Sequence, residues 1–278
     1  MSVLRDAEGR VRAPWVVLTF TAIAGVIAAI CLTVVALTLP ASPDVLSPKI
    51  VFFTLPSLIA GLIATFACAR LFKESTALES RRWIDLGTGF GVGALVLTIS
   101  VLGPVLAGQT TLAINREVSW PNLLGQFIGL APAGFGEELL LRGLGLVALR
   151  RWIGDVPAVV GSSAIFGLLH LTNPHASVVA AAIITLVGLW FGATVVRTGG
   201  LYFAMGLHVG WNFFQGVVWG QPVSGMAPDG ALFVSRWASE RGFWSGGDFG
   251  PEAAGWTAVV LATALVVTLF WRRRQSAN

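Results

Sequence analysis

The sequence contains few of the residues that build soluble or disulfide-stabilised proteins. Only 12% of its 278 residues are charged, about half of the roughly 25% that is typical of soluble domains. It has two cysteines, Cys31 and Cys68, and both lie in apolar runs. Neither a disulfide framework nor a zinc-ligand spacing is present, so we expect both to be small buried apolar residues. The composition excludes an ordinary soluble enzyme and a cysteine-based scaffold.

Long apolar segments dominate the chain instead. Hydrophobic residues make up 55% of the sequence, and its mean hydropathy is +0.78. The first run, 13–39, exceeds the roughly 7–15 residues of a signal-peptide core, so we interpret it as a retained anchor. A membrane span needs about 20 apolar residues, and eight segments qualify: 14–39, 50–72, 84–107, 121–149, 156–171, 176–196, 199–220 and 255–271. The sequence predicts an all-α polytopic membrane helix bundle, with one integral membrane domain over residues 1–278.

The distribution of lysine and arginine predicts the orientation of this bundle. With the N-terminus inside, thirteen Lys and Arg residues lie on the inner side, four lie outside, and Arg142 lies within a span. Positive residues favour the cytoplasmic side, so both termini are predicted to be cytoplasmic. The Lys and Arg residues in the loops between spans also account for the pI of about 9.8. We therefore expect the lipid bilayer, and no nucleic acid, as a partner.

Three ionisable residues of the predicted fourth span lie within one short cluster, although charge inside a membrane is costly and usually functional. Glu138 and Arg142 are four residues apart, so they share a helix face and can pair. Glu137 points about 100° away, which leaves its carboxylate free to act as a general base or acid. The alternative is a charge-balancing network that only joins helices.

Two further clusters repeat the four-residue spacing. His208 and Asn212 share a helix face and could donate hydrogen bonds to a developing oxyanion; the alternative is an interhelical hydrogen bond. Phe166 and His170 form the other cluster, in which Phe166 is expected to pack and His170 is weak evidence alone. His175 follows in a predicted loop, and we interpret it as an interfacial residue without a catalytic role.

The predicted depths of these clusters are similar. At 1.5 Å per residue, Glu137 and His170 would each lie roughly 20 Å from the cytoplasmic ends of their spans, and His208 roughly 14 Å. The three could therefore converge. Pro132, before Glu137, removes a backbone hydrogen bond and predicts either a locally opened helix beside a wet pocket or a packing kink.

The three motifs, in their order along the chain, resemble those of a known family. They are GEELLLRG at 136–143, FGLLH at 166–170 and HVGWN at 208–212. The set is similar to that of the CPBP intramembrane proteases, which include type II CAAX prenyl endopeptidases and bacteriocin-processing relatives. The resemblance covers about residues 120–220, the predicted protease core, and implies a bundle of about eight helices with a membrane-embedded active site.

The resemblance also implies roles for the motif residues. By motif position, Glu137 and His170 would activate the attacking water. His208 and Asn212 would hold the oxyanion.

The family resemblance gives Glu138 and Arg142 a supporting role, in agreement with the helix-face argument. It leaves the metal open, because family members have been described both as metalloproteases and as metal-independent glutamate enzymes. If a metal is present, Glu137, His170 and His208 are the candidate ligands, and zinc accepts such a set. We do not expect an obligatory metal.

The predicted function is therefore an intramembrane endopeptidase of the CAAX-protease type. Its substrate would be a membrane-embedded or membrane-anchored peptide or protein, and the location a prokaryotic cell membrane. Whether the substrate is a prenylated protein or a pheromone or bacteriocin precursor stays open. One alternative is a transporter with a buried proton relay, although the repeated broken-helix halves of transporters are missing. Another is a non-catalytic immunity or chaperone protein.

The segment 221–254 has no function that the sequence reveals. It is rich in glycine and includes GGDFGPE at 246–252, a stretch similar to one in some bacterial members of the family. We expect outward-facing turns, and a lid over the site is the alternative.

Overall fold

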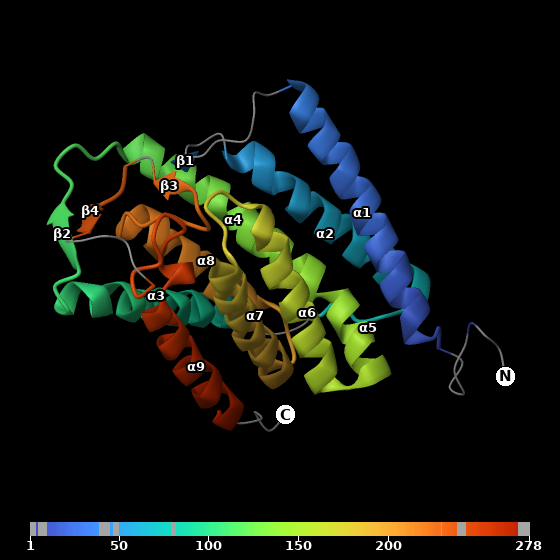
Figure 1. Cartoon of the computed structure of the whole chain (residues 1–278). Coiled ribbons are helices and arrows are strands. Elements are labelled where there is room, and N and C mark those ends of the chain that lie inside the picture. The colour runs from blue at the N-terminus through green and yellow to red at the C-terminus, as the bar shows by residue number, and fades with distance from the viewer. Residues whose placement is uncertain are drawn as a thin grey trace.

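The computed structural model describes residues 4, 10–38, 45–46, 50–78, 82–228, 230–237 and 243–271, and it is a bundle of helices (Figure 1). Their bounds are α1 Ala13–Thr38, α2 Val51–Phe72, α3 Arg82–Leu106, α4 Trp120–Arg142, α5 Leu144–Ile153, α6 Asp155–Leu169, α7 Val178–Thr198, α8 Tyr202–Asn212 and α9 Gly255–Phe270. The helical bundle predicted from the sequence is present.

Two small sheets that the sequence analysis did not predict join loops at one end of this bundle. Strand β1 (Val45–Leu46) pairs in parallel with β3 (Ala227–Pro228), and β2 (Thr110–Ile114) pairs antiparallel with β4 (Phe233–Trp237). Both sheets therefore tie the segment 221–254 to loops from the first half of the chain.

Five helical segments of the described chain are long and apolar enough to cross a membrane: 13–38, 51–72, 82–106, 155–172 and 178–198. They support an integral membrane protein. Helix α4 is also long, but its polar residues, Glu137 and Glu138 among them, make it less apolar. Helices α8 and α9 are shorter, with 11 and 16 residues. The count of eight spans therefore stays a prediction.

The predicted span 121–149 is wrong as one continuous helix. Gly143, with φ −73° and ψ −143°, separates α4 from α5. Glu137 consequently lies only five residues before the end of α4, about 7.5 Å along the axis, and the earlier depth of roughly 20 Å is too large.

The other two motifs lie where helical geometry changes. Helix α6 ends at Leu169, and His170 begins a 3-10 turn that extends to Thr172. Helix α8 ends at Asn212 and continues as a π-helical turn over Phe213–Val218. Such π turns are frequent at functional sites.

Helices α3 and α8 pack with their backbones in close contact, and glycines make this possible. Gly89 and Gly93 of α3 face the α8 backbone, while Gly206 and Gly210 of α8 face the α3 backbone. A Cβ added at any of the four would come within 2.2 Å of a carbonyl oxygen. This small-residue spacing is a common way to bring membrane helices together, and here it fixes the helix that carries His208.

A glycine comparison within α3 tests this packing. Gly93→Ala is expected to lower the stability of the folded bundle by about 1–3 kcal/mol, because the added methyl group overpacks the contact. Gly91→Ala is the matched control, since nothing lies within 4 Å of a Cβ at that position. Thermal unfolding of both variants in detergent checks this. Equal midpoints would contradict the close-packing argument.

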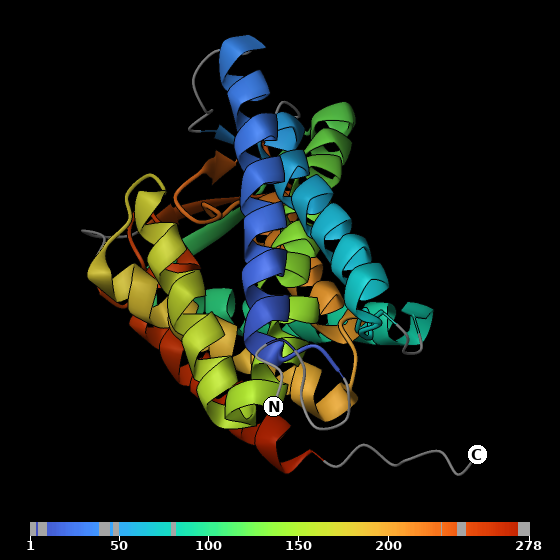
Figure 2. The ribbon, with the colours of Figure 1, turned by 90° about the vertical axis from the view of Figure 1, so that its right-hand side faces the viewer.

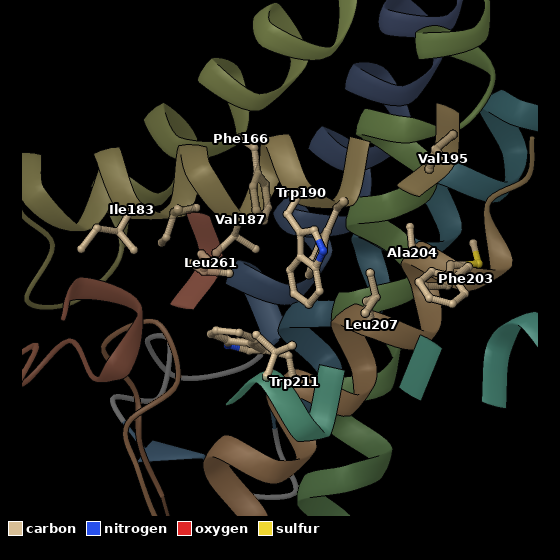
Figure 3. Close-up of a cluster of buried hydrophobic side chains, with 14 of the residues drawn as sticks. Phe166, Ile183, Val187, Trp190, Val195, Phe203, Ala204, Leu207, Trp211 and Leu261 are labelled. Carbon is tan, nitrogen blue, oxygen red and sulfur yellow. The ribbon is translucent and has the colours of Figure 1, made fainter. Parts of the chain in front are cut away.

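The largest apolar core lies behind the third motif. Figure 3 shows Phe166 of α6, Trp190 of α7 and Trp211 of α8 in one cluster of buried side chains, and the centres of the Trp190 and Trp211 rings are 6.4 Å apart. The side chains of Trp190 and Trp211 are each only 1% exposed. This core packs α7 against α8, the helix that carries His208 and Asn212.

Helix α1 lies at the edge of the bundle. It runs along α2 in Figure 1 and is in front when the molecule is turned by 90° (Figure 2). Its beginning and the end of α9 are at the same end of the bundle in both views. The cytoplasmic location of that end stays a prediction.

Candidate active site

The three motifs meet at one pocket. Glu137 from α4, His170 from the 3-10 turn, and His208 and Asn212 from α8 all line a cavity of about 220 Å³. The convergence predicted from helix depth is therefore present, although the depth of Glu137 was overestimated. Glu138 and Arg142 do not line the cavity but lie buried behind it.

Glu138 and Arg142 form the buried pair that their spacing predicts. Nη1 of Arg142 donates to Oε1 of Glu138 over 3.0 Å, and both side chains have no exposed surface. The Arg142 guanidinium also lies 4.2 Å from the centre of the Phe166 ring, a cation–π contact. Phe166 thus packs as expected, and its partner is the arginine of the first motif.

His208 joins this pair, which helix spacing could not reveal. Its Nδ1 lies 3.1 Å from the same oxygen, Oε1 of Glu138. A carboxylate accepts, so Nδ1 carries the proton and donates. Glu138 therefore orients His208, in the way that second-layer carboxylates usually orient a functional imidazole.

Glu137 is the freer carboxylate, as its helix face predicts. Its side chain is 31% exposed, and Oε2 lies 3.8 Å from Nε2 of His208. That oxygen is buried but has no hydrogen-bond partner among the described residues. An unpaired carboxylate oxygen at a polar cavity is well suited to accept a proton or hold a water molecule.

His170 is held in one tautomer. Its Nδ1 lies 2.8 Å from the carbonyl oxygen of Phe166. A carbonyl only accepts, so Nδ1 donates, and Nε2 of the neutral imidazole keeps its lone pair. The ring also packs edge-on against Phe166, with 4.5 Å between centres. His170 thus presents a hydrogen-bond acceptor to the cavity that it lines.

Asn212 and His175 differ in their relation to the cavity. Asn212 is 5% exposed and lines it, beyond the turn of α8 that carries His208. His175, in contrast, is exposed on a turn with φ 56° and does not line it.

The sequence analysis missed four polar residues of the pocket, Thr54, Asn173, Ser224 and Glu252. Ser224 and Glu252 belong to the segment 221–254. The Ser224 backbone N–H and hydroxyl donate to Oε2 of Glu252 over 2.5 and 2.9 Å. Burial raises the pKa of the Glu252 carboxyl, while nearby His170 and the Ser224 hydrogen bonds act in the opposite direction. The sequence signal for Glu252 was its position as an acidic residue at the end of the glycine-rich stretch 246–252.

The expectation of outward-facing turns for 221–254 is therefore wrong for part of this segment. Val223, Ser224, Met226 and Glu252 form one wall of the pocket. The sheets with β1 and β2 hold the segment there, through backbone pairing that no local pattern predicts.

The pocket does not form a recognisable metal centre. Across the described ranges, no group of three or more His, Cys, Asp or Glu side chains is arranged to hold a metal ion. The Nδ1 atoms of His170 and His208 are engaged with Phe166 and Glu138, which leaves their Nε2 atoms available at the cavity.

A protease fits this combination of a helical membrane bundle and a polar pocket, and a family comparison agrees. Residues 119–214 match the family described as type II CAAX prenyl endopeptidase Rce1-like. The match spans all three motifs and confirms the relationship to the CPBP intramembrane proteases predicted from them. No curated protein matches the chain. The matched segment ends before Ser224 and Glu252.

Proposed function

We propose that this protein is an intramembrane endopeptidase that hydrolyses peptide bonds of membrane-associated proteins or peptides. The observation that carries the proposal is the shared cavity of Glu137, His170, His208 and Asn212. It brings a free carboxylate, two imidazoles and an amide to one place. The family match supports the same reaction class.

Glu137 and His170 activate the attacking water molecule. One O–H of a water molecule points to Glu137, which takes the proton, and the other donates a hydrogen bond to Nε2 of His170. The water oxygen forms a bond to the peptide carbonyl carbon, and the π electrons move to the carbonyl oxygen. Glu137 then returns the proton to the leaving nitrogen as the C–N bond breaks.

His208 and Asn212 stabilise the oxyanion by hydrogen bonds. Asn212 offers its amide N–H groups. Protonated at both nitrogens, His208 would donate from Nε2, because Nδ1 is engaged with Glu138. The Glu138–Arg142 pair keeps this imidazole in place without touching the substrate.

Replacing Asn212 or His208 by alanine is expected to reduce the chemical rate about 10²–10³-fold. Their hydrogen bonds strengthen as charge develops on the carbonyl oxygen, so binding of an uncleaved substrate should change little. Single-turnover rates and dissociation constants measure the two effects. Asn212→Ala is the cleaner variant, since His208 also contacts Glu138. Weaker binding with an unchanged rate would assign both residues to substrate positioning.

A labelled membrane peptide in liposomes tests the function as a whole. Purified protein is expected to release two fragments, and Glu137→Gln none. Proton or solute flux through the liposomes without cleavage would favour the transporter hypothesis. Neither cleavage nor flux, over a panel of prenylated and unprenylated peptides, would favour a non-catalytic membrane protein.

A further inference from the structure

Glu252 is a carboxylate of the pocket that neither the motifs nor the family match includes. It lies in the 3-10 turn Pro251–Ala253 and is only 7% exposed. A buried carboxylate is costly unless it is hydrogen-bonded or close to positive charge. Its surroundings therefore indicate what it does.

The chain around Glu252 is built to hold it in place. Its Oε2 accepts both Ser224 hydrogen bonds. Gly225 donates its N–H to Phe249 O over 3.0 Å and packs so closely on Pro174 that a Cβ would collide with the carbonyl oxygen there. Two pieces of the segment 221–254 are thus fixed against the turn that follows His170.

His170 and Glu252 line the same cavity, and Gly225, next to Ser224, packs against Pro174 in the turn after His170. The charge of a protonated His170 acts to lower the pKa of the Glu252 carboxyl. The other titratable groups at the cavity are Glu137 and His208, and both lie beside the buried Glu138–Arg142 pair. His208 has the Glu138 carboxylate at hydrogen-bond distance, and Glu252 is the buried carboxylate that shares the cavity with His170. Glu138 is within the first motif, whereas Glu252 comes from a distant part of the chain.

We propose that Glu252 is a positioning residue that acts through His170. Its carboxylate, fixed by Ser224, stabilises the positive charge that develops on the imidazole as Nε2 draws on an O–H bond of the attacking water. The inference rests on the proposed function, because it assigns His170 to water activation. The segment 221–254 would then complete the catalytic machinery in addition to covering it.

Glu252→Gln is the test, because glutamine keeps the shape and can still accept from Ser224 while removing the charge. It is expected to lower kcat by at least about tenfold with KM unchanged, because at an effective dielectric constant near 20 even two unit charges roughly 10 Å apart interact by more than a tenfold factor. Glu117→Gln is the matched control: it removes the charge of an exposed loop residue that does not line the cavity, and kcat should stay at the wild-type value. Thermal midpoints establish that each variant is folded.

A double-mutant cycle shows whether Glu252 acts through His170. In a His170→Gln background, the residual rate should no longer respond to Glu252→Gln. In an Asn212→Ala background, the tenfold effect should persist. If Glu252→Gln does not fold, the same cycle is run with Glu252→Asp, which keeps the charge but moves it, and its smaller effect must also vanish without His170.

Three results would overturn the inference: a wild-type kcat in Glu252→Gln, an equal effect in both backgrounds, or an equal loss in Glu117→Gln. Failure of the proposed function looks different. In that case the wild-type protein itself cleaves no peptide, or His170→Gln cleaves as fast as wild type.

Discussion

Glu137→Gln is expected to stop peptide hydrolysis while leaving the protein folded and inserted. Loss of a general base typically costs about 10²–10⁴ in rate, and glutamine cannot take the proton of the water. The fold should tolerate the change, because Oε2 of Glu137 has no hydrogen-bond partner among the described residues and the side chain is 31% exposed. Cleavage of a labelled peptide in liposomes and the thermal midpoint in detergent give the two readouts.

Glu117→Gln is the matched control for this variant. Glu117 is exposed in the loop between β2 and α4, and it does not line the pocket. The Glu117→Gln variant should therefore cleave the peptide at the wild-type rate. Full activity in Glu137→Gln would remove Glu137 from the mechanism, and a collapsed thermal midpoint would mean that its role is structural.

Arg142→Ala is expected to destabilise the protein far more than Glu137→Gln does. The substitution leaves Glu138 buried without its cation, and breaking a buried pair typically costs about 3–5 kcal/mol. The cation–π contact with Phe166 is lost as well. Expression, insertion and thermal midpoint should all fall. Activity should fall with them, since His208 is oriented by Glu138.

A second arginine nearby provides the comparison. Arg150 donates to Asp155 over 2.8 Å, but their side chains are 24% and 52% exposed. Exposed pairs contribute about 0–1 kcal/mol, so Arg150→Ala should leave the midpoint almost unchanged. If the two alanine variants are equally stable, the buried pair does not hold the site together.

Residues that lie on one helix were predicted best. The Glu138–Arg142 pair and the free face of Glu137 follow from the fixed geometry of an α-helix, in which residues four apart are neighbours. The depth of Glu137 was predicted less well, because Gly143 ends α4 where the apolar run continues. Hydropathy detects apolar length, and a local backbone break leaves that length unchanged.

Contacts between distant segments could not be predicted in this way. The bond from His208 to Glu138 joins residues 70 positions apart, and Glu252 is held at the pocket by Ser224, which lies 28 positions earlier. The glycines of α3 and α8 were visible in the sequence, but only the packed structure shows that they face each other.

By itself, the sequence determined the helical membrane class, the resemblance to a protease family over residues 119–214 and the residues of the three motifs. These follow from hydropathy, helical periodicity and motif order, each of which is a local property of the chain. Only the tertiary structure decided that Glu138 is the carboxylate partner of His208, and that the segment 221–254 supplies a wall of the pocket and a further acidic group. Those features depend on backbone pairing and close helix packing between segments far apart in the chain, so no local pattern contains them.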